Sequence, residues 1–121
     1  MAEARPPRLR LLDILNAIRM CELLAARTDI DEQIKRYATE RALEIISEAS
    51  RHIPDSMKSQ ERDIPWINIA AFGNVARHGY DQLVGETLDD AVRHDLPILK
   101  AACERLYAQV KRPADPWPDA S

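Results

Sequence analysis

Glycine and phenylalanine are scarce in this sequence, which has three glycines and one phenylalanine in 121 residues. An all-β sandwich or barrel needs many tight turns, so this shortage argues against one. Leu, Ile, Ala, Arg and Glu dominate instead, and most of these residues favour helices. The composition predicts an all-α fold, an antiparallel bundle of four to five helices, and the length suits a single domain over residues 1–121.

The sequence also lacks an excess of positive charge, because its formal net charge is -3. Non-specific nucleic-acid binders hold phosphates through a broad positive field, so any contact with a nucleic acid is expected to be local. No apolar run approaches the roughly 20 residues of a membrane span, and Asp13 and Arg19 interrupt the stretch that a secretory signal would need. We therefore expect a cytoplasmic protein with no membrane contact.

Only two cysteines are present, Cys21 and Cys103, and they lie far apart in predicted helices. There is no CxxC pair, so we expect reduced, buried thiols rather than a disulfide. The three histidines lie on separate predicted segments, which argues against a metal site, and no cofactor is predicted. Glu44 and Glu48 have the spacing of a carboxylate pair, but a solvated acidic face is favoured.

Apolar residues recur at three- and four-residue intervals along most of the chain, as in amphipathic helices. Pro97 interrupts the last of these segments and predicts a kink, or two helices meeting near Asp95. The pattern predicts four helices: one over residues 9–26, one from the capping residues Thr28 and Asp29 to about His52, one from Pro65 to Gly79, and one over 88–110. A loop with at most one helical turn is predicted at 53–63. Tails are predicted at 1–7 and 112–121, and the second tail is either flexible or held by Trp117.

Near the end of the third predicted helix, an otherwise apolar sequence contains the polar trio Asn74, His78 and Tyr80. Histidine suits proton transfer, because its unperturbed pKa of about 6.5 lies near working pH. Asn74 lies four residues before His78, so its amide shares a helical face with the imidazole. Plainer alternatives are a helix-end histidine, a solvent-facing asparagine and a loop tyrosine that covers the core.

The trio, with Ile64-Pro-Trp ahead of it, resembles the motif of the HepT-like toxins, or DUF86 family, a branch of the HEPN ribonucleases. In that motif an arginine is followed by Asn, three residues, His, one residue and Tyr. Further similar segments occur in the family's order at residues 10–18, 41–49 and 95–97. The resemblance implies a HEPN-like homodimer whose two motifs meet at a shared cleft.

The resemblance also implies a role. It makes His78 the proton-transfer residue of a ribonuclease toxin that acts on RNA without a metal. The partner is then a small nucleotidyltransferase antitoxin, which transfers AMP from ATP onto the tyrosine of the motif, here Tyr80. The bulky phosphates on Tyr80 would block the path of the RNA.

Gly73 occupies the position of the family's arginine, and this departure limits the functional prediction. Three explanations of this glycine are considered: an engineered or spontaneous inactivating substitution, natural decay to an inactive form, and close helix packing that excludes a Cβ atom. Inactivation is favoured over packing. Arg77 is a candidate RNA contact, but it lies about 100° around the helix from His78 and is poorly placed as a replacement. The prediction is therefore an endoribonuclease that is weakened or inactivated by Gly73. The alternative is a non-catalytic HEPN interaction module that dimerises and binds the nucleotidyltransferase.

Overall fold

The computed structural model describes residues 4–77 and 91–117. Within these residues no strand occurs, and the predicted all-α fold is confirmed. In chain order the described elements are α1 (Pro7–Ala26), α2 (Glu32–Arg51), α3 (Asp55–Lys58), the 3₁₀ turn η1 (Ser59–Glu61), α4 (Trp66–Arg77), the π-helical segment η2 (Ala91–Asp95) and α6 (Leu96–Val110).

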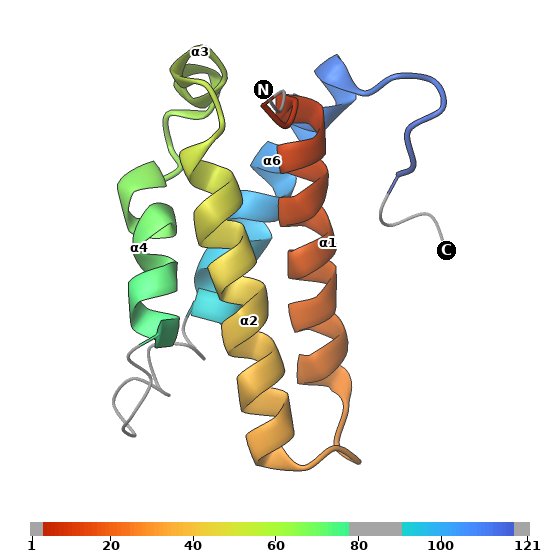
Figure 1. Ribbon diagram of the computed structural model, residues 1–121, viewed down its shortest axis with the longest axis vertical. Coiled ribbons are helices and arrows are strands. Elements are labelled where there is room, and N and C mark those ends of the chain that lie inside the picture. Colours follow the sequence, from red (N-terminus) through yellow and green to blue (C-terminus); the bar gives the residue numbers. More distant parts are fainter. Residues whose placement is uncertain (1–3, 78–90, 118–121) are drawn as a thin grey trace.

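The four long helices run in alternating directions along one axis (Figure 1). α1 and α2 form the antiparallel hairpin that the short connection between them predicts. α4 packs on α2 and runs antiparallel to it, while α6 packs on α1 behind the hairpin. α4, which contains Asn74, is therefore held mainly by α2.

One apolar core fills the space between these helices, and each fully buried Leu or Ile in it contributes about 1.5–3 kcal/mol. Two serines of α2, Ser47 and Ser50, are buried beside it. The largest fully buried side chains are Leu11, Ile14, Ile18, Leu43, Ile46, Ile69, Leu96, Leu99, Leu106 and Tyr107.

The N-terminus of α2 is capped by Asp31, whose carboxylate accepts hydrogen bonds from the backbone N–H groups of Gln33 at 2.9 Å and Ile34 at 3.2 Å. The prediction that Thr28 and Asp29 supply the cap is wrong. Asp29 instead pairs with the guanidinium of Arg27 at 2.7 Å. A capping side chain must stand directly before the first turn, and only Asp31 does so.

Two helices meet at Asp95, as Pro97 predicts: η2 ends there and α6 begins at Leu96. Pro97 lies in the first turn of α6, where its missing N–H leaves no hydrogen bond unmade. The predicted loop at 53–63 contains two short turns, α3 and η1, rather than at most one. The expected end of the third helix at Gly79 lies outside the described residues.

The described part of the C-terminal tail contacts α1 and α6. Of the two alternatives expected for this tail, flexible or held by Trp117, the structure shows the second. The Trp117 ring is 5.3 Å from that of Tyr107, whose hydroxyl donates to the carbonyl of Pro116. Asp115 accepts from Arg8 of α1 at 3.1 Å, and both side chains of this pair are largely buried.

Candidate functional site

The site begins with the way α4 is anchored at its N-terminus. Trp66 is partly buried against the core, and its indole N–H donates to the carbonyl of Glu61 at 3.2 Å. The Glu61 carboxylate accepts from Arg105 of α6 at 2.6 Å and 3.0 Å, and this guanidinium lowers the pKa of Glu61. Lys58 lies 5.8 Å from the centre of the Trp66 ring. Trp66 thus supports the motif helix, as expected for a core anchor.

A second anchor joins the middle of α4 to α2 through the backbone carbonyl of Ala70. This oxygen accepts a hydrogen bond from the hydroxyl of Ser47 and another from Nη2 of Arg51 at 3.0 Å. Ser47 is buried, so its hydroxyl needs this partner. Because side-chain bonds to one carbonyl fix both the rotation and the axial position of a helix, Ser47 and Arg51 set the register of α4 on α2.

The sequence reasoning missed Ser47 and Arg51. A signal was present, because Ser47 and Ser50 interrupt the apolar stripe of α2 at core positions. A serine in such a stripe indicates a hydrogen bond to a neighbouring element. The identity of the acceptor depends on the packing of α4, which periodicity does not give.

Gly73, where the resemblance places the arginine of the family motif, is buried on the same side of α4 as Ile69 and Phe72. It follows Ala70, the acceptor of the Ser47 bond, by less than one turn. A residue without Cβ is favoured where two helices approach closely. The burial of Gly73 therefore supports close packing as a physical reason for this glycine.

The remaining motif residues are placed only in part. Asn74 and Arg77 belong to α4, which ends at Arg77. His78 and Tyr80 lie outside the described residues, and their pairing with Asn74 stays a prediction.

Glu44 and Glu48, the carboxylates with pair spacing, form ion pairs with basic residues of α2. Glu44 pairs with Arg41 at 3.3 Å, and Glu48 pairs with His52 at 3.1 Å. Among the described side chains, no group of three or more His, Cys, Asp or Glu residues is arranged to hold a metal ion. No helix in the described ranges is long and apolar enough to cross a membrane.

A further charged pair lies within α2. Nε of Arg36 donates to Oε1 of Glu40 at 3.1 Å, one turn apart on α2. The Glu40 side chain is only 14% exposed and that of Arg36 is 36% exposed. These charges lie on the same helix as Ser47, toward its N-terminus.

The described geometry defines an all-α bundle in which α2 braces α4, a mostly apolar helix that contains Asn74 and ends at Arg77. A profile of the ribonuclease HepT-like family matches residues 14–106, and the chain belongs to this family. No solved structure matches the chain significantly.

Two relatives are similar over most of their own length. The "Probable ribonuclease HepT" of Thermococcus cleftensis is 33% identical over 100 residues, which cover 79% of this chain and 91% of the relative. A candidate RNase of Methanocaldococcus jannaschii, MJ1380, is 35% identical over 75 residues, covering 62% of this chain and 69% of the relative.

Proposed function

We propose that this chain is a metal-independent endoribonuclease, the toxin of a toxin–antitoxin pair, with activity weakened by glycine at position 73. The observation that carries the proposal is the family match over residues 14–106, a range that contains Asn74, His78 and Tyr80. These three residues resemble the family motif. The relatives' names, both of which specify a ribonuclease, support RNA as the substrate.

The proposed reaction is an internal transesterification. His78 takes the proton of a 2′-hydroxyl, the 2′-oxygen bonds to phosphorus, and the bond from phosphorus to the 5′-oxygen breaks. A proton delivered to that oxygen gives a 5′-hydroxyl end, and the other end keeps a 2′,3′-cyclic phosphate. Asn74 orients the imidazole or the phosphate, and a cation is required for the extra negative charge on phosphorus.

The test uses the purified chain and a labelled single-stranded RNA in the presence of a chelator. We expect slow cleavage that His78→Ala abolishes, and a product that carries the cyclic phosphate. Gly73→Arg protein that a thermal melt shows to be folded is expected to cleave faster, and its expression without an antitoxin is expected to arrest growth. Cleavage that requires an added metal, or that survives His78→Ala, contradicts the proposal.

The second candidate function is a non-catalytic module, and the absence of arginine at Gly73 favours it. Such a module keeps the dimer and binds the nucleotidyltransferase without chemistry. A Gly73→Arg protein that is folded, inactive and harmless, but still binds a nucleotidyltransferase, decides for the module.

We further propose that Tyr80 accepts AMP from the nucleotidyltransferase antitoxin in the cytoplasm. Incubation with that partner and ATP should add the mass of AMP to the intact chain, and Tyr80→Phe should prevent the addition. Tyr37→Phe is the matched control, because Tyr37 is 61% exposed on α2. An adduct that survives Tyr80→Phe refutes the assignment.

A further inference from the structure

α4 lies at one edge of the bundle, on the far side of α2 from α1, as Figure 1 shows. Its most extensive packing among the described elements is on α2. Within residues 66–73, the large side chains that are buried are those of Ile69 and Phe72, while Ile67 is 86% accessible. Because α4 buries so little apolar surface, it contributes less to the stability of the core than α1 or α6 does.

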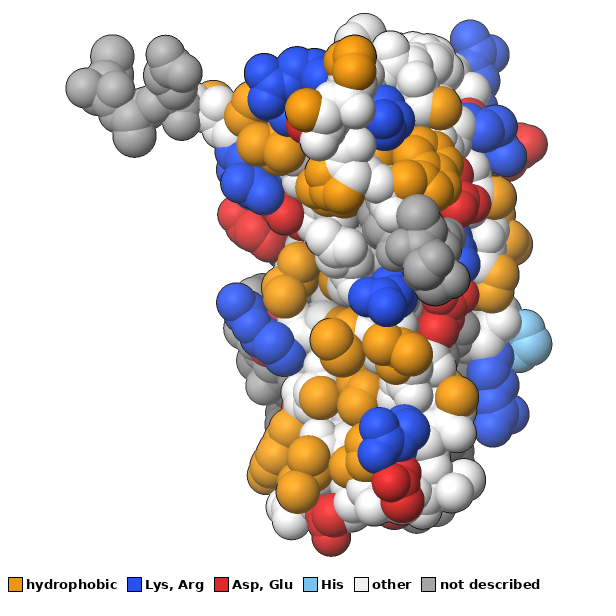
Figure 2. Space-filling view, turned by 90° about the vertical axis from the view of Figure 1, so that its right-hand side faces the viewer, with side chains coloured by type: hydrophobic (Ala, Val, Ile, Leu, Met, Phe, Trp, Pro, Cys, Tyr) orange, Lys and Arg blue, Asp and Glu red, His pale blue; other side chains and the backbone are white. Residues whose placement is uncertain are grey.

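The opposite edge of the bundle is held by side chains that reach from one element to another. Arg8 of α1 binds Asp115 of the tail at 3.1 Å, and Lys100 of α6 binds Glu22 of α1 at 3.2 Å. Figure 2 shows this side of the molecule, on which acidic and basic side chains lie next to one another. α1 and α6 are therefore joined by ion pairs as well as by a large apolar interface.

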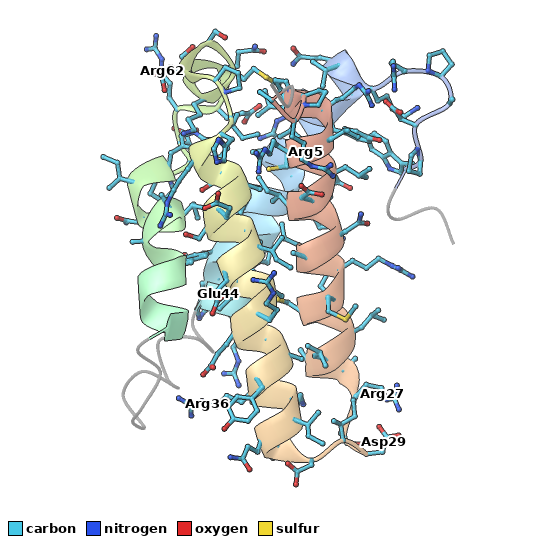
Figure 3. The ribbon with its side chains drawn as sticks, viewed as in Figure 1. Arg5, Arg27, Asp29, Arg36, Glu44 and Arg62 are labelled. Atoms are coloured by element: carbon cyan, nitrogen blue, oxygen red, sulfur yellow. The ribbon has the colours of Figure 1, made fainter. Side chains whose placement is uncertain are left out.

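The polar contact between α2 and α4 has a different form, because two side chains of α2 converge on one backbone oxygen. The hydroxyl of the buried Ser47 and Nη2 of Arg51, at 3.0 Å, both donate to the carbonyl of Ala70. A serine side chain is short, so this bond requires the backbones of α2 and α4 to lie close together. Figure 3 shows the two ribbons side by side, with side chains in the space between them.

The Ala70 oxygen also has an ordinary donor within α4. In an α-helix the carbonyl of residue 70 accepts from the N–H of residue 74, which is Asn74 in this chain. A carbonyl oxygen has two lone pairs, so three donors share them. The bonds from Ser47 and Arg51 therefore act directly on the turn that contains Gly73 and Asn74, and they break when that turn moves away from α2.

We propose that α4 opens away from α2 as a separate cooperative unit, and that Ser47 and Arg51 form a latch on the Ala70 carbonyl that keeps it closed. The buried apolar contacts of α4 are few, so the two latch bonds are a large part of what this opening must break. The inference does not depend on the proposed ribonuclease activity. It bears on that activity through Asn74, because Asn74 lies on the helix that opens.

Hydrogen–deuterium exchange of the full chain, followed by mass spectrometry of its peptides, tests the proposal. In the unmodified chain the amides of α4 should exchange faster than those of residues 99–107 in α6. Ser47→Ala should accelerate the exchange of α4 about fivefold, the factor for one net hydrogen bond, and leave residues 99–107 unaltered. Arg51→Met should act in the same direction, and because Arg51 is exposed this change leaves the core intact.

Ser50→Ala is the matched control for Ser47→Ala. Ser50 is also a buried serine of α2, but its hydroxyl donates to the carbonyl of Ser47 in the same helix at 2.8 Å. Arg27→Met is the control for Arg51→Met, since Arg27 is an exposed arginine that pairs with Asp29 at the loop between α1 and α2, away from α4 in Figure 3. Neither control should change the ratio of α4 exchange to α6 exchange, and circular dichroism should show that every variant is folded.

If the α4 amides of the unmodified chain exchange as slowly as those of α6, α4 does not open separately and the proposal is wrong. The latch is overturned if Ser47→Ala accelerates both regions by the same factor, or alters α4 no more than Ser50→Ala does. Faster exchange confined to α4 in both Ser47→Ala and Arg51→Met, with unchanged controls, supports both parts of the proposal.

Discussion

Gly73 is the single residue on which the catalytic prediction most depends, and its burial gives a test of why it is there. At an exposed helical position, replacing glycine by alanine stabilises a protein by about 1 kcal/mol. At a closely packed position the added methyl group costs about 1–3 kcal/mol through overpacking. We expect Gly73→Ala to lower the free energy of unfolding, measured by urea denaturation.

The control for this prediction is Ala71→Gly, at an exposed position of the same helix. This substitution should cost about 1 kcal/mol from helix propensity alone. A Gly73→Ala protein more stable than the unmodified chain would show that packing does not require glycine. Inactivation would then be the better explanation of this residue.

The two cysteines give a second prediction about individual side chains. Burial raises the pKa of both Cys21 and Cys103 to about 12. Because only the thiolate reacts, a raised pKa means almost no reactive form at pH 8. We expect no reaction of the folded protein with a thiol reagent such as dithiobisnitrobenzoate, and reaction of both thiols in concentrated urea. Rapid modification of either cysteine in the folded protein would contradict the burial that the structure shows.

The C-terminal tail, which contacts α1 through Arg8 and α6 through Tyr107, is expected to stabilise the bundle. Trp117 stacks near the Tyr107 ring, and Asp115 pairs with Arg8 in a largely covered position. Trp117→Ala removes a partly buried aromatic contact and should cost roughly 1–2 kcal/mol of unfolding free energy. It should also increase the exposure of Tyr107, which near-ultraviolet circular dichroism can follow. Trp66→Ala provides the comparison, and should cost more because Trp66 also anchors α4. Equal stability with and without Trp117 would show that the tail is not held.

The long helices were predictable because their information is local. Apolar spacing and the proline positions gave α1, α2 and the junction at Asp95 within a few residues. The cap at Asp31 was missed because Thr28, Asp29 and Asp31 all have a high propensity to cap a helix N-terminus. The structure distinguishes them, because Asp29 pairs with Arg27 while Asp31 binds the first turn of α2. The motif residues were found by resemblance. Ser47 and Arg51, which bind the Ala70 carbonyl of α4, were not. Their significance comes from the register between two helices, which one sequence does not encode at short range.

The pH dependence of the unfolding free energy at acidic pH tests ion pairs in different parts of the molecule at once. The Arg105 guanidinium lowers the pKa of Glu61 below its ordinary value of 4.5, and the Arg112 backbone N–H, with Arg8, lowers that of Asp115 below 3.8. A carboxylate with a lowered pKa in the folded state stabilises that state above its unfolded pKa, and the stabilisation is lost as pH falls through the folded value. We expect the urea midpoint to be level near neutral pH and to fall below about pH 4.5. Glu61→Gln should flatten part of this fall, and an unchanged profile would show that the pair contributes nothing.

Exposed apolar side chains on α4 bear on the expected homodimer. α4 exposes Ile67, which is 86% accessible, and Ala71 follows one turn later on the same face, also exposed. Apolar side chains exposed on the helix that carries the motif favour a two-fold contact, in which each substitution acts twice. We expect light scattering to give twice the chain mass of 13.8 kDa for the unmodified protein, and the single-chain mass for Ile67→Glu. Ile98→Glu, at a 56% exposed position on α6, should leave the dimer intact. If the unmodified chain is monomeric at micromolar concentration, two motifs cannot share one cleft, and any RNA cleavage must then come from a single subunit.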